Sequence, residues 1–479
     1  MELFNLLSGA DVAIGLFGET YDVYLNWIGK IIQWLIAGVG SVGVGIILFS
    51  LVLKLIVLPF DIYQRVAMRK QNIKMKENQA KMEKLQEQYA NNKEMYNQQV
   101  MEMYKESGIS MFSSCLPMIL SMVIFIVAIN AFNAYSQYSN IENYNTMVDA
   151  YNKGILAYAP ELNAENVSDD GTLITVKDEN GADKYIYYTL AVPKDENGNA
   201  VDYTANGYQY IKETLNANKA FFIDVDKANA NEEIKAYVET AVANGAAENA
   251  DVALKAYFSE QGQDAVVVAY DEEVRQHTKF LWIKNIWVTD AMYKNPVLEY
   301  EGSVSCFGAE GFKNQMSREK FDVNGKKMNL TEISQVTNAY NVDQYNIVTG
   351  KLDAQKGEAN GYFILVVLSI GTILLQQFVS MRSQKEQQKY SSVDGQGASQ
   401  QKMMMVMMTG MFAIFSFSYS SAFSIYMIMS NLFSLVSTLI INKAVDTVED
   451  RKERAALIEK HSRRLPGRGV EKKDNEKKK

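Results

Sequence analysis

Long uncharged apolar runs lie near both ends of this 479-residue chain, and a polar, acidic stretch separates them. The chain averages conceal this segregation, because a mean hydropathy of −0.16 and a net charge of −8 would suit an ordinary soluble protein. A run of roughly 18 or more apolar residues is a candidate transmembrane helix, since about 20 residues cross the hydrocarbon of a bilayer. The pattern therefore predicts a polytopic membrane protein.

The apolar runs predict five membrane spans, at residues 42–60, 111–132, 362–379, 403–417 and 421–441. The first span is expected to end at Pro59. Before it, the amphipathic segment 24–38 carries two tryptophans, which is typical of a helix at the membrane interface. The alternative is that this segment simply extends the helix of the first span.

Clustered Lys and Arg residues predict the topology. They concentrate in residues 61–112, in the loop 382–402 and in the tail 443–479. By the positive-inside rule all three are expected to be cytoplasmic, so the N-terminus and residues 135–360 lie outside. Residues 61–112 are also strongly helix-forming, and the break at Asn91 and Asn92 predicts two antiparallel helices.

The outer region is expected to contain an inserted α+β domain. The sequence predicts a β-hairpin from 172–177 and 184–192 and a further strand at 265–270. It also predicts two helices, at 231–245 and 251–262. The chain accordingly divides into an interfacial helix with the first span (1–60), the cytoplasmic hairpin (61–112), the second span (113–134), the inserted domain (135–279), a second interfacial segment with a loop (280–360), the last three spans (361–442) and the basic tail (443–479).

Enzyme chemistry finds no support in the sequence. Cys115 and Cys306 are expected on opposite sides of the membrane and therefore do not pair. His277 and His461 lie far apart with no ligand-like spacing around them. We expect no catalytic residues, no metal and no cofactor.

Lys54 is the most informative residue of the spans. A charge at the middle of a span costs about 2.5–3.5 kcal/mol on insertion scales, so it is expected to face a water-accessible groove. The alternative is a lysine that snorkels to the surface. No Asp or Glu lies within the five predicted spans, so Lys54 has no obvious counter-ion there. Other polar residues of the spans either line the same groove or form ordinary interhelical hydrogen bonds: Ser50, Ser121, Gln376 and Gln377.

Five segments resemble, in order, the core of the YidC/Oxa/Alb membrane protein insertases, and of the bacterial YidC type in particular. They are ILFSLVLKLIVLPF (47–60), YKESGISMFSSCLPMILSM (104–122), FLWIKNIWVTD (280–290), GYFILVVLSIGTILLQQ (361–377) and SSAFSIYMIMSNLFSLVSTLIINK (420–443). The resemblance covers about half of the chain and leaves out 140–278 and the tail. It implies an all-α core of five transmembrane helices around a hydrophilic groove that is open to the cytoplasm and to lipid.

The resemblance also implies the residues of that groove. Lys54 stands where the family has an arginine, so the charge is kept but the two-pronged grip on a carboxylate is lost. Ser121 stands where a larger amide is expected and Met427 where tryptophan is expected. The expected groove set is Lys54, Ser50, Ser121, Gln376, Gln377 and Met427.

The implied function is the insertion of nascent membrane proteins into the lipid bilayer of the cell membrane, alone or with the Sec translocon. The ribosome is an expected partner, and no small-molecule substrate is expected. The tail residues Arg463, Arg464, Arg468, Lys472 and Lys473 could bind ribosomal RNA or anionic lipid. A rival hypothesis is a membrane-anchored receptor or cell-envelope assembly factor that acts through its outer domain. A solute transporter is disfavoured, because internal repeats and intramembrane carboxylates are both missing from the sequence.

Overall fold

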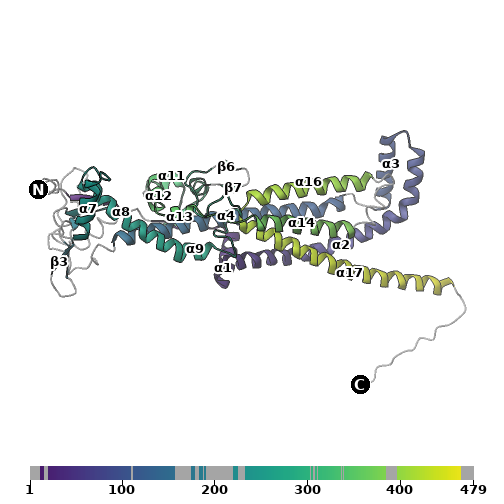
Figure 1. Ribbon diagram of the computed structural model, residues 1–479. Coiled ribbons are helices and arrows are strands. Elements are labelled where there is room, and N and C mark those ends of the chain that lie inside the picture. The colour runs from purple at the N-terminus through teal and green to yellow at the C-terminus, as the bar shows by residue number, and fades with distance from the viewer. Residues whose placement is uncertain are drawn as a thin grey trace, which may run out of the picture. The chain divides into compact units, whose positions relative to one another are not determined.

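The computed structural model describes residues 11–15, 20–108, 112–156, 174–177, 183–186, 188–189, 220–224, 232–302, 304–305, 308–309, 311–335, 337, 339–383 and 396–464. The chain forms two compact units, and Figure 1 shows their elements. Unit 1 consists of Met1–Ile46, Ile129–Leu365 and Phe417–Phe423. Unit 2 consists of Ile47–Ala128, Val366–Ser416 and Ser424–Lys479.

Unit 2 is built from helices that leave many apolar side chains exposed. Within the described residues, three helices are long and apolar enough to cross a membrane, in α2 (Val42–Gln88), in α14 (Ile364–Ser383) and in α17 (Ser421–Arg464). Val367 and Val406 are 66% and 73% exposed, which is typical of helices that face lipid. Two other predicted spans fall in α4 (Phe112–Leu156) and α16 (Gln396–Ser418), of which α16 contains a shorter apolar stretch.

The first span was expected to end at Pro59, and the helix that contains it does not stop there. α2 passes through Pro59 and is 47 residues long in total. A proline inside a helix removes one backbone hydrogen bond, and membrane helices tolerate it. The residues that follow are rich in Lys, Gln, Glu and Met, which are good helix formers, so the helix carries on beyond the apolar run.

The second helix of the basic hairpin, α3 (Lys93–Glu106), begins at the predicted break. The side chain of Asn92 caps it by accepting a hydrogen bond from the Met95 backbone N–H at 3.1 Å. A small buried cluster that includes Met82 and Tyr104 joins α3 to α2, and the Tyr104 hydroxyl donates to Met82 Sδ at 3.3 Å. The hairpin thus has a core of its own.

In unit 1, α1 (Trp27–Val39) is a separate helix. Asn26 caps its start, and Gly40 ends it with a φ of +68°, a conformation that glycine adopts without strain. α1 is therefore not an extension of α2, which excludes the alternative considered for this segment. Trp27 and Trp34 are 72% and 74% exposed, as expected of residues that lie at a membrane interface.

An aromatic core holds the rest of unit 1 together. The Tyr144 side chain of α4 is fully buried. The centroid of its ring lies 4.6 Å from that of Phe312 in α10 (Phe312–Met316) and 5.2 Å from that of Tyr345 in α12 (Val342–Val348). Its hydroxyl donates to the Ala339 carbonyl at 2.7 Å. Such pairs stabilise a fold beyond the apolar area that they bury.

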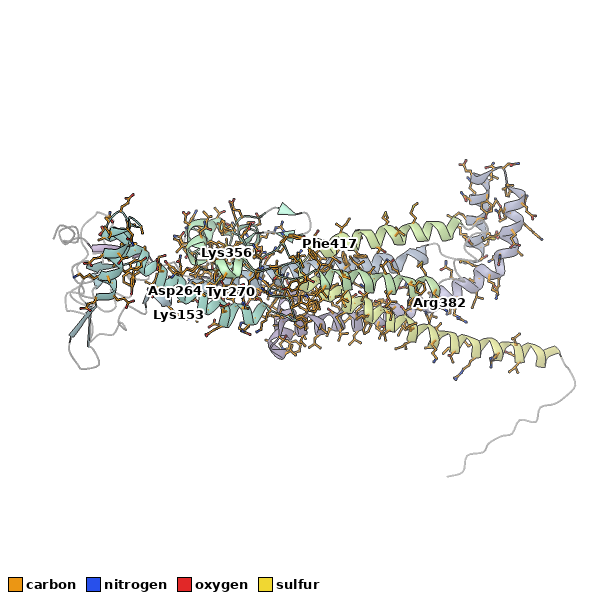
Figure 2. The ribbon with its side chains drawn as sticks, viewed as in Figure 1. Lys153, Asp264, Tyr270, Lys356, Arg382 and Phe417 are labelled. Carbon is orange, nitrogen blue, oxygen red and sulfur yellow. The ribbon has the colours of Figure 1, made fainter. Side chains whose placement is uncertain are left out.

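The strand predicted at 265–270 is wrong, because these residues are helical. They form the end of α8 (Ala250–Ala269) and the start of a π-helical turn, η2 (Tyr270–Val274), whose first residue is labelled in Figure 2. Valine is enriched in strands, but this preference depends strongly on the surrounding packing. Here Asn249 caps a long helix that buries Val266 in the core, and this context overrides the local preference.

The remaining elements of unit 1 are short. β2 and β3 pair antiparallel where the hairpin was predicted, and 231–245 contains a helix as predicted. The helices are α7 (Glu232–Ala243), α9 (Arg275–Thr278), α11 (Leu330–Ile333) and α13 (Asp353–Lys356). The sheets are β1 (Asp11–Gly15), β5 (Ala220–Asp224) and β4 (Tyr188–Thr189) in the order β1-β5-β4, β2 (Ile174–Lys177) with β3 (Asp183–Ile186), β6 (Val304–Ser305) with β7 (Gly308–Ala309), and β8 (Phe321–Val323) with β9 (Lys326–Met328).

Two buried polar side chains shape the loop that precedes α14. Asn360, with no exposed surface, donates to the carbonyls of Asn285 and Thr289, both at 3.0 Å. The Asp290 carboxylate accepts from the backbone N–H groups of Tyr362 and Leu365, each at 2.6 Å, and so caps the start of α14.

Candidate functional site

The Lys54 ammonium group contacts a neighbouring helix in unit 2. Lys54 is half-buried in the apolar half of α2, and its Nζ donates to Ser434 Oγ of α17 at 3.1 Å. The neighbouring Leu55 and Ile56 are 56% and 63% exposed, as lipid-facing side chains would be. The charge therefore lies on the face of α2 that packs against α17.

A second cation of α2 contacts α17 further along. Arg65 Nη2 donates to Thr438 Oγ1 at 2.7 Å, and its Nη1 donates to Asn442 Oδ1 at 3.3 Å. Residues 54 and 65 are eleven positions apart, which is about three helical turns or roughly 16 Å. The two cations therefore share one face of α2.

An acidic residue lies between these two cations. Asp61 follows Lys54 by seven positions and precedes Arg65 by four, so it occupies the same face, and its carboxylate interacts electrostatically with both. We call this set the polar seam: Lys54, Asp61 and Arg65 of α2 with Ser434, Thr438 and Asn442 of α17. Its formal charge is two positive and one negative, a net of one positive.

The polar face of α17 continues towards its N-terminus. Asn431 precedes Ser434 by one turn, and its Nδ2 is buried without a hydrogen-bond partner among the described residues. The same holds for Ser424 Oγ, two turns further back. A buried donor without a partner costs about 1–3 kcal/mol, so this end of the face is suited to a polar group that arrives from elsewhere.

The other predicted groove residues distribute over several helices. Ser50 is buried one turn before Lys54 on α2, and Met427 is buried two turns before Ser434 on α17, so each lies on the face that carries the seam. Gln377 instead accepts from Thr409 of α16 at 2.6 Å, which joins α14 to α16. Gln376 is half-buried on α14 with no contact to the seam described.

Some predicted residues lie outside what the structure describes. Ser121 is part of α4, and Arg463 and Arg464 end α17, but their side chains are not described. Arg468, Lys472 and Lys473 lie wholly beyond the described residues, as does Cys306. Within the described part of the chain, no group of three His, Cys, Asp or Glu side chains could hold a metal ion.

Sequence reasoning missed Asp61 and Arg65 as site residues. Arg65 was counted among the basic residues of the hairpin, and Asp61 fell just outside a span that was expected to end at Pro59. The signal was the spacing of residues 54, 61 and 65 on one helical face, matched by polar residues at 434, 438 and 442. It becomes visible once α2 is taken as continuous.

A family model matches most of the chain, whereas the individual relatives match shorter stretches. The family model described as 60Kd inner membrane protein matches residues 34–173 and 265–448, and leaves 174–264 unmatched. The chain is 35% identical over 98 residues to the membrane protein insertase YidC of Caldanaerobacter subterraneus, which is 20% of this chain and 46% of that protein. It is 38% identical over 86 residues to the protein of the same name from Clostridium tetani, covering 18% of this chain and 37% of that protein.

A third relative of that name, from Fusobacterium nucleatum, is 35% identical over 86 residues, or 18% of this chain and 40% of that protein. The matched stretches thus span less than half of the length of each of these three relatives. No solved structure matched the chain.

Proposed function

Because the chain belongs to the 60Kd inner membrane protein family, we propose that this membrane protein is an insertase, which moves nascent membrane proteins from the cytoplasm into the bilayer. Its relatives that carry the name of membrane protein insertase support this function. The proposed site of action is the polar seam of unit 2.

The single observation that carries the proposal is the half-buried Lys54, which contacts Ser434 within an apolar helix. A charge in this setting costs about 2.5–3.5 kcal/mol and persists where it serves a function. The net positive seam would attract an acidic or polar segment of a client, and the Asn431 amide would offer it a hydrogen bond.

The proposed mechanism has two stages. The polar end of a client enters the seam near Lys54, which lowers the barrier to its transfer. Its apolar segment then moves sideways into lipid along exposed residues such as Leu55 and Val367. The driving energy comes from burial of the client's apolar segment and, where acidic groups cross, from the membrane potential.

The proposed topology has five membrane spans, in α2, α4, α14, α16 and α17. The N-terminus and 135–360 would lie outside, and the hairpin, the loop 382–402 and the tail would lie in the cytoplasm. The exposed tryptophans of α1 and the apolar surfaces of α14 and α17 support this arrangement.

The proposed partners follow from the same arrangement. Basic residues of the tail would contact ribosomal RNA or anionic lipid, and the Sec translocon would act together with the protein on some clients. Neither contact is needed for the seam itself to receive a client.

The test is insertion of a short single-span client into liposomes that contain only this protein. Protease protection of the client's translocated end is expected above the level of empty liposomes. Lys54→Ala should reduce protection, and Lys54→Arg should restore it because arginine keeps the charge. Lys255→Ala, which removes an exposed lysine of α8, is the matched control.

The rival function, a receptor or envelope assembly factor that acts through the outer domain, makes the opposite forecast. It expects Lys54→Ala to be silent in cells and removal of residues 140–278 to abolish activity. Protection that is equal in wild type, Lys54→Ala and empty liposomes, together with that deletion phenotype, would replace the insertase proposal.

A further inference from the structure

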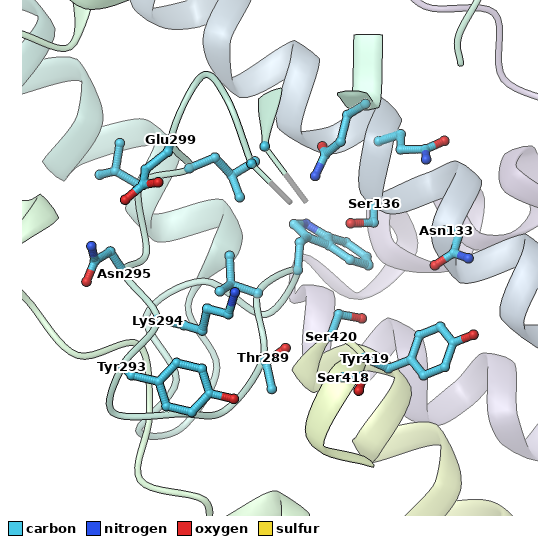
Figure 3. Close-up of a pocket in the computed structure, with 18 residues that line it drawn as sticks. Asn133, Ser136, Thr289, Tyr293, Lys294, Asn295, Glu299, Ser418, Tyr419 and Ser420 are labelled. Carbon is cyan, nitrogen blue, oxygen red and sulfur yellow. The ribbon is translucent and has the colours of Figure 1, made fainter. Parts of the chain in front are cut away.

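Unit 1 contains a cavity of about 340 Å³ that is separate from the polar seam. Figure 3 shows Asn133 and Ser136 of α4 on one side of it and Asn295 and Glu299 on the opposite side. Further lining comes from α10, through Gln315, and from the short turn at 418–420. The volume lies within the range of about 300–1,000 Å³ that is typical of ligand sites.

Ring packing and hydrogen bonds connect the walls of this cavity. Trp287 packs its ring 5.2 Å from Tyr135, and its backbone N–H donates to Asn285 Oδ1 at 3.0 Å. The next residue, Val288, accepts through its carbonyl from both the backbone N–H and the hydroxyl of Ser421, at 3.0 and 2.7 Å. A site with fixed walls loses little entropy when a ligand binds.

One donor of the lining is left without a partner. The Trp287 side chain is only 5% exposed, and its Nε1 has no hydrogen-bond partner among the described residues. A buried indole N–H usually has a partner. The Trp287 ring lines the cavity, so a bound ligand would change the surroundings of this indole.

The other polar groups offer both donors and acceptors. Gln137 and Gln315 are 8% and 5% exposed, and the side-chain oxygen of Gln315 accepts from the Asn140 amide at 3.0 Å. Ser136 and Ser420 supply hydroxyls. Amides and hydroxyls both donate and accept, so they suit a ligand that carries C=O and N–H groups together.

The charge of the lining favours an uncharged ligand. Among the described residues of the lining, Lys294 and Glu299 carry charges, and these are of opposite sign. Apolar surface comes from Val297, Leu298 and Tyr293, which could receive small side chains. This combination lacks the clustered cations that a phosphate or carboxylate ligand needs.

We infer that this cavity is a binding site for an extended, uncharged stretch of polypeptide. Each peptide unit presents one N–H and one C=O, which matches the mixed donors and acceptors of the lining. At one edge the cavity is lined by Gly302 and Gly311, which have no side chains of their own. The inference goes beyond the insertase proposal and does not depend on it.

The test uses the full chain in lipid nanodiscs, labelled with 5-fluorotryptophan. The four tryptophans give separate fluorine resonances, and Trp287→Phe assigns the one that matters. The probe is the uncharged hexapeptide acetyl-Gly-Ser-Thr-Gly-Ser-Thr-amide. It is expected to shift the Trp287 resonance saturably and to leave those of Trp27 and Trp34 in place.

Two variants test the lining. Gln137→Leu keeps the shape but removes the amide, and should weaken the peptide about tenfold, as expected for the loss of one or two hydrogen bonds. Ser420→Ala is the milder second variant, in case the first fails to fold, and should weaken it by a smaller factor. The inference is overturned if the peptide leaves the Trp287 resonance unmoved, if both variants titrate like wild type, or if maltose shifts the resonance and the peptide does not.

Discussion

The guanidinium of Arg65 lies 2.7 Å from the hydroxyl oxygen of Thr438, and so joins the middle of α2 to α17. This contact lies beyond Pro59, in a part of α2 that sequence analysis assigned to the hairpin. The polar seam therefore contains two cations, Lys54 and Arg65. In our proposal both act on the same client.

Arg65→Ala is expected to slow client insertion into liposomes by about tenfold or more, since hydrogen bonds from charged groups contribute roughly 1.5–3 kcal/mol. Arg65→Lys should recover part of the rate, because lysine keeps the charge but cannot contact Thr438 and Asn442 together. Lys76→Ala, at an exposed position of the same helix, is the control. Equal rates for Arg65→Ala and wild type would remove Arg65 from the site.

Asp290→Ala is expected to lower the free energy of unfolding of the protein in detergent by roughly 2–4 kcal/mol, and so its melting temperature. The change leaves three backbone N–H groups at the start of α14 without their acceptor, those of Tyr362, Phe363 and Leu365. Asp264→Ala removes a carboxylate that is 58% exposed and pairs with Lys351 at 2.8 Å, and should cost less than about 1 kcal/mol. Similar melting temperatures for the two variants would contradict this role of Asp290.

Stability should fall as the pH rises from about 4.5 to about 7, in part through Glu142. Burial, with the nearby carboxylate of Asp22, raises the pKa of Glu142 to about 7. Between its ordinary pKa and this value the folded state holds a proton that the unfolded state has released, so rising pH favours unfolding. Glu142 lies in α4 beyond the predicted second span.

Glu142→Gln should remove this part of the pH dependence. The variant is expected to gain on the order of 1–2 kcal/mol over wild type at pH 8, after allowance for solvent screening, and little at pH 4.5. Chemical denaturation at the two pH values measures it, with the exposed Glu248→Gln as the control. A gain that is the same at both pH values would show that the Glu142 charge is not the cause.

Two glycine substitutions should differ in their effect on stability. In α8, a Cβ on Gly262 would lie 2.7 Å from the Tyr151 ring, so Gly262→Ala should destabilise unit 1 by about 1–3 kcal/mol. In α14, nothing lies within 4 Å of a Cβ on Gly371, so Gly371→Ala should be neutral or slightly stabilising. Thermal unfolding of both variants tests this, and a loss of stability that is larger for Gly371→Ala would contradict it.

Sequence patterns predicted the elements that depend on local signals. The apolar runs predicted the apolar parts of α2, α14 and α17, and the break at Asn91 and Asn92 predicted the start of α3, which Asn92 caps. The strand predicted at 265–270 failed because packing against the unit 1 core, and not the preference of valine, decides its conformation.

The site was only partly accessible from sequence. Lys54 could be singled out because a charge in an apolar run is costly. Its partner Ser434 lies 380 positions away along the chain, and nothing local marks which face of α17 meets α2. The cavity around Trp287 was missed for the same reason, since its walls come from three distant segments. There Trp287 is buried, although its segment was predicted to lie at the membrane interface.

α17 runs without interruption from Ser421 to Arg464, through both the seam and the start of the basic tail. The stretch from Asn442 to Arg464 is 23 residues, or about 33 Å of continuous helix. A helix of this kind transmits torque and axial displacement, whereas a flexible linker would absorb them. A partner that binds the basic end of α17 can therefore rotate this helix, and so move Ser434 and Thr438 relative to Lys54 and Arg65.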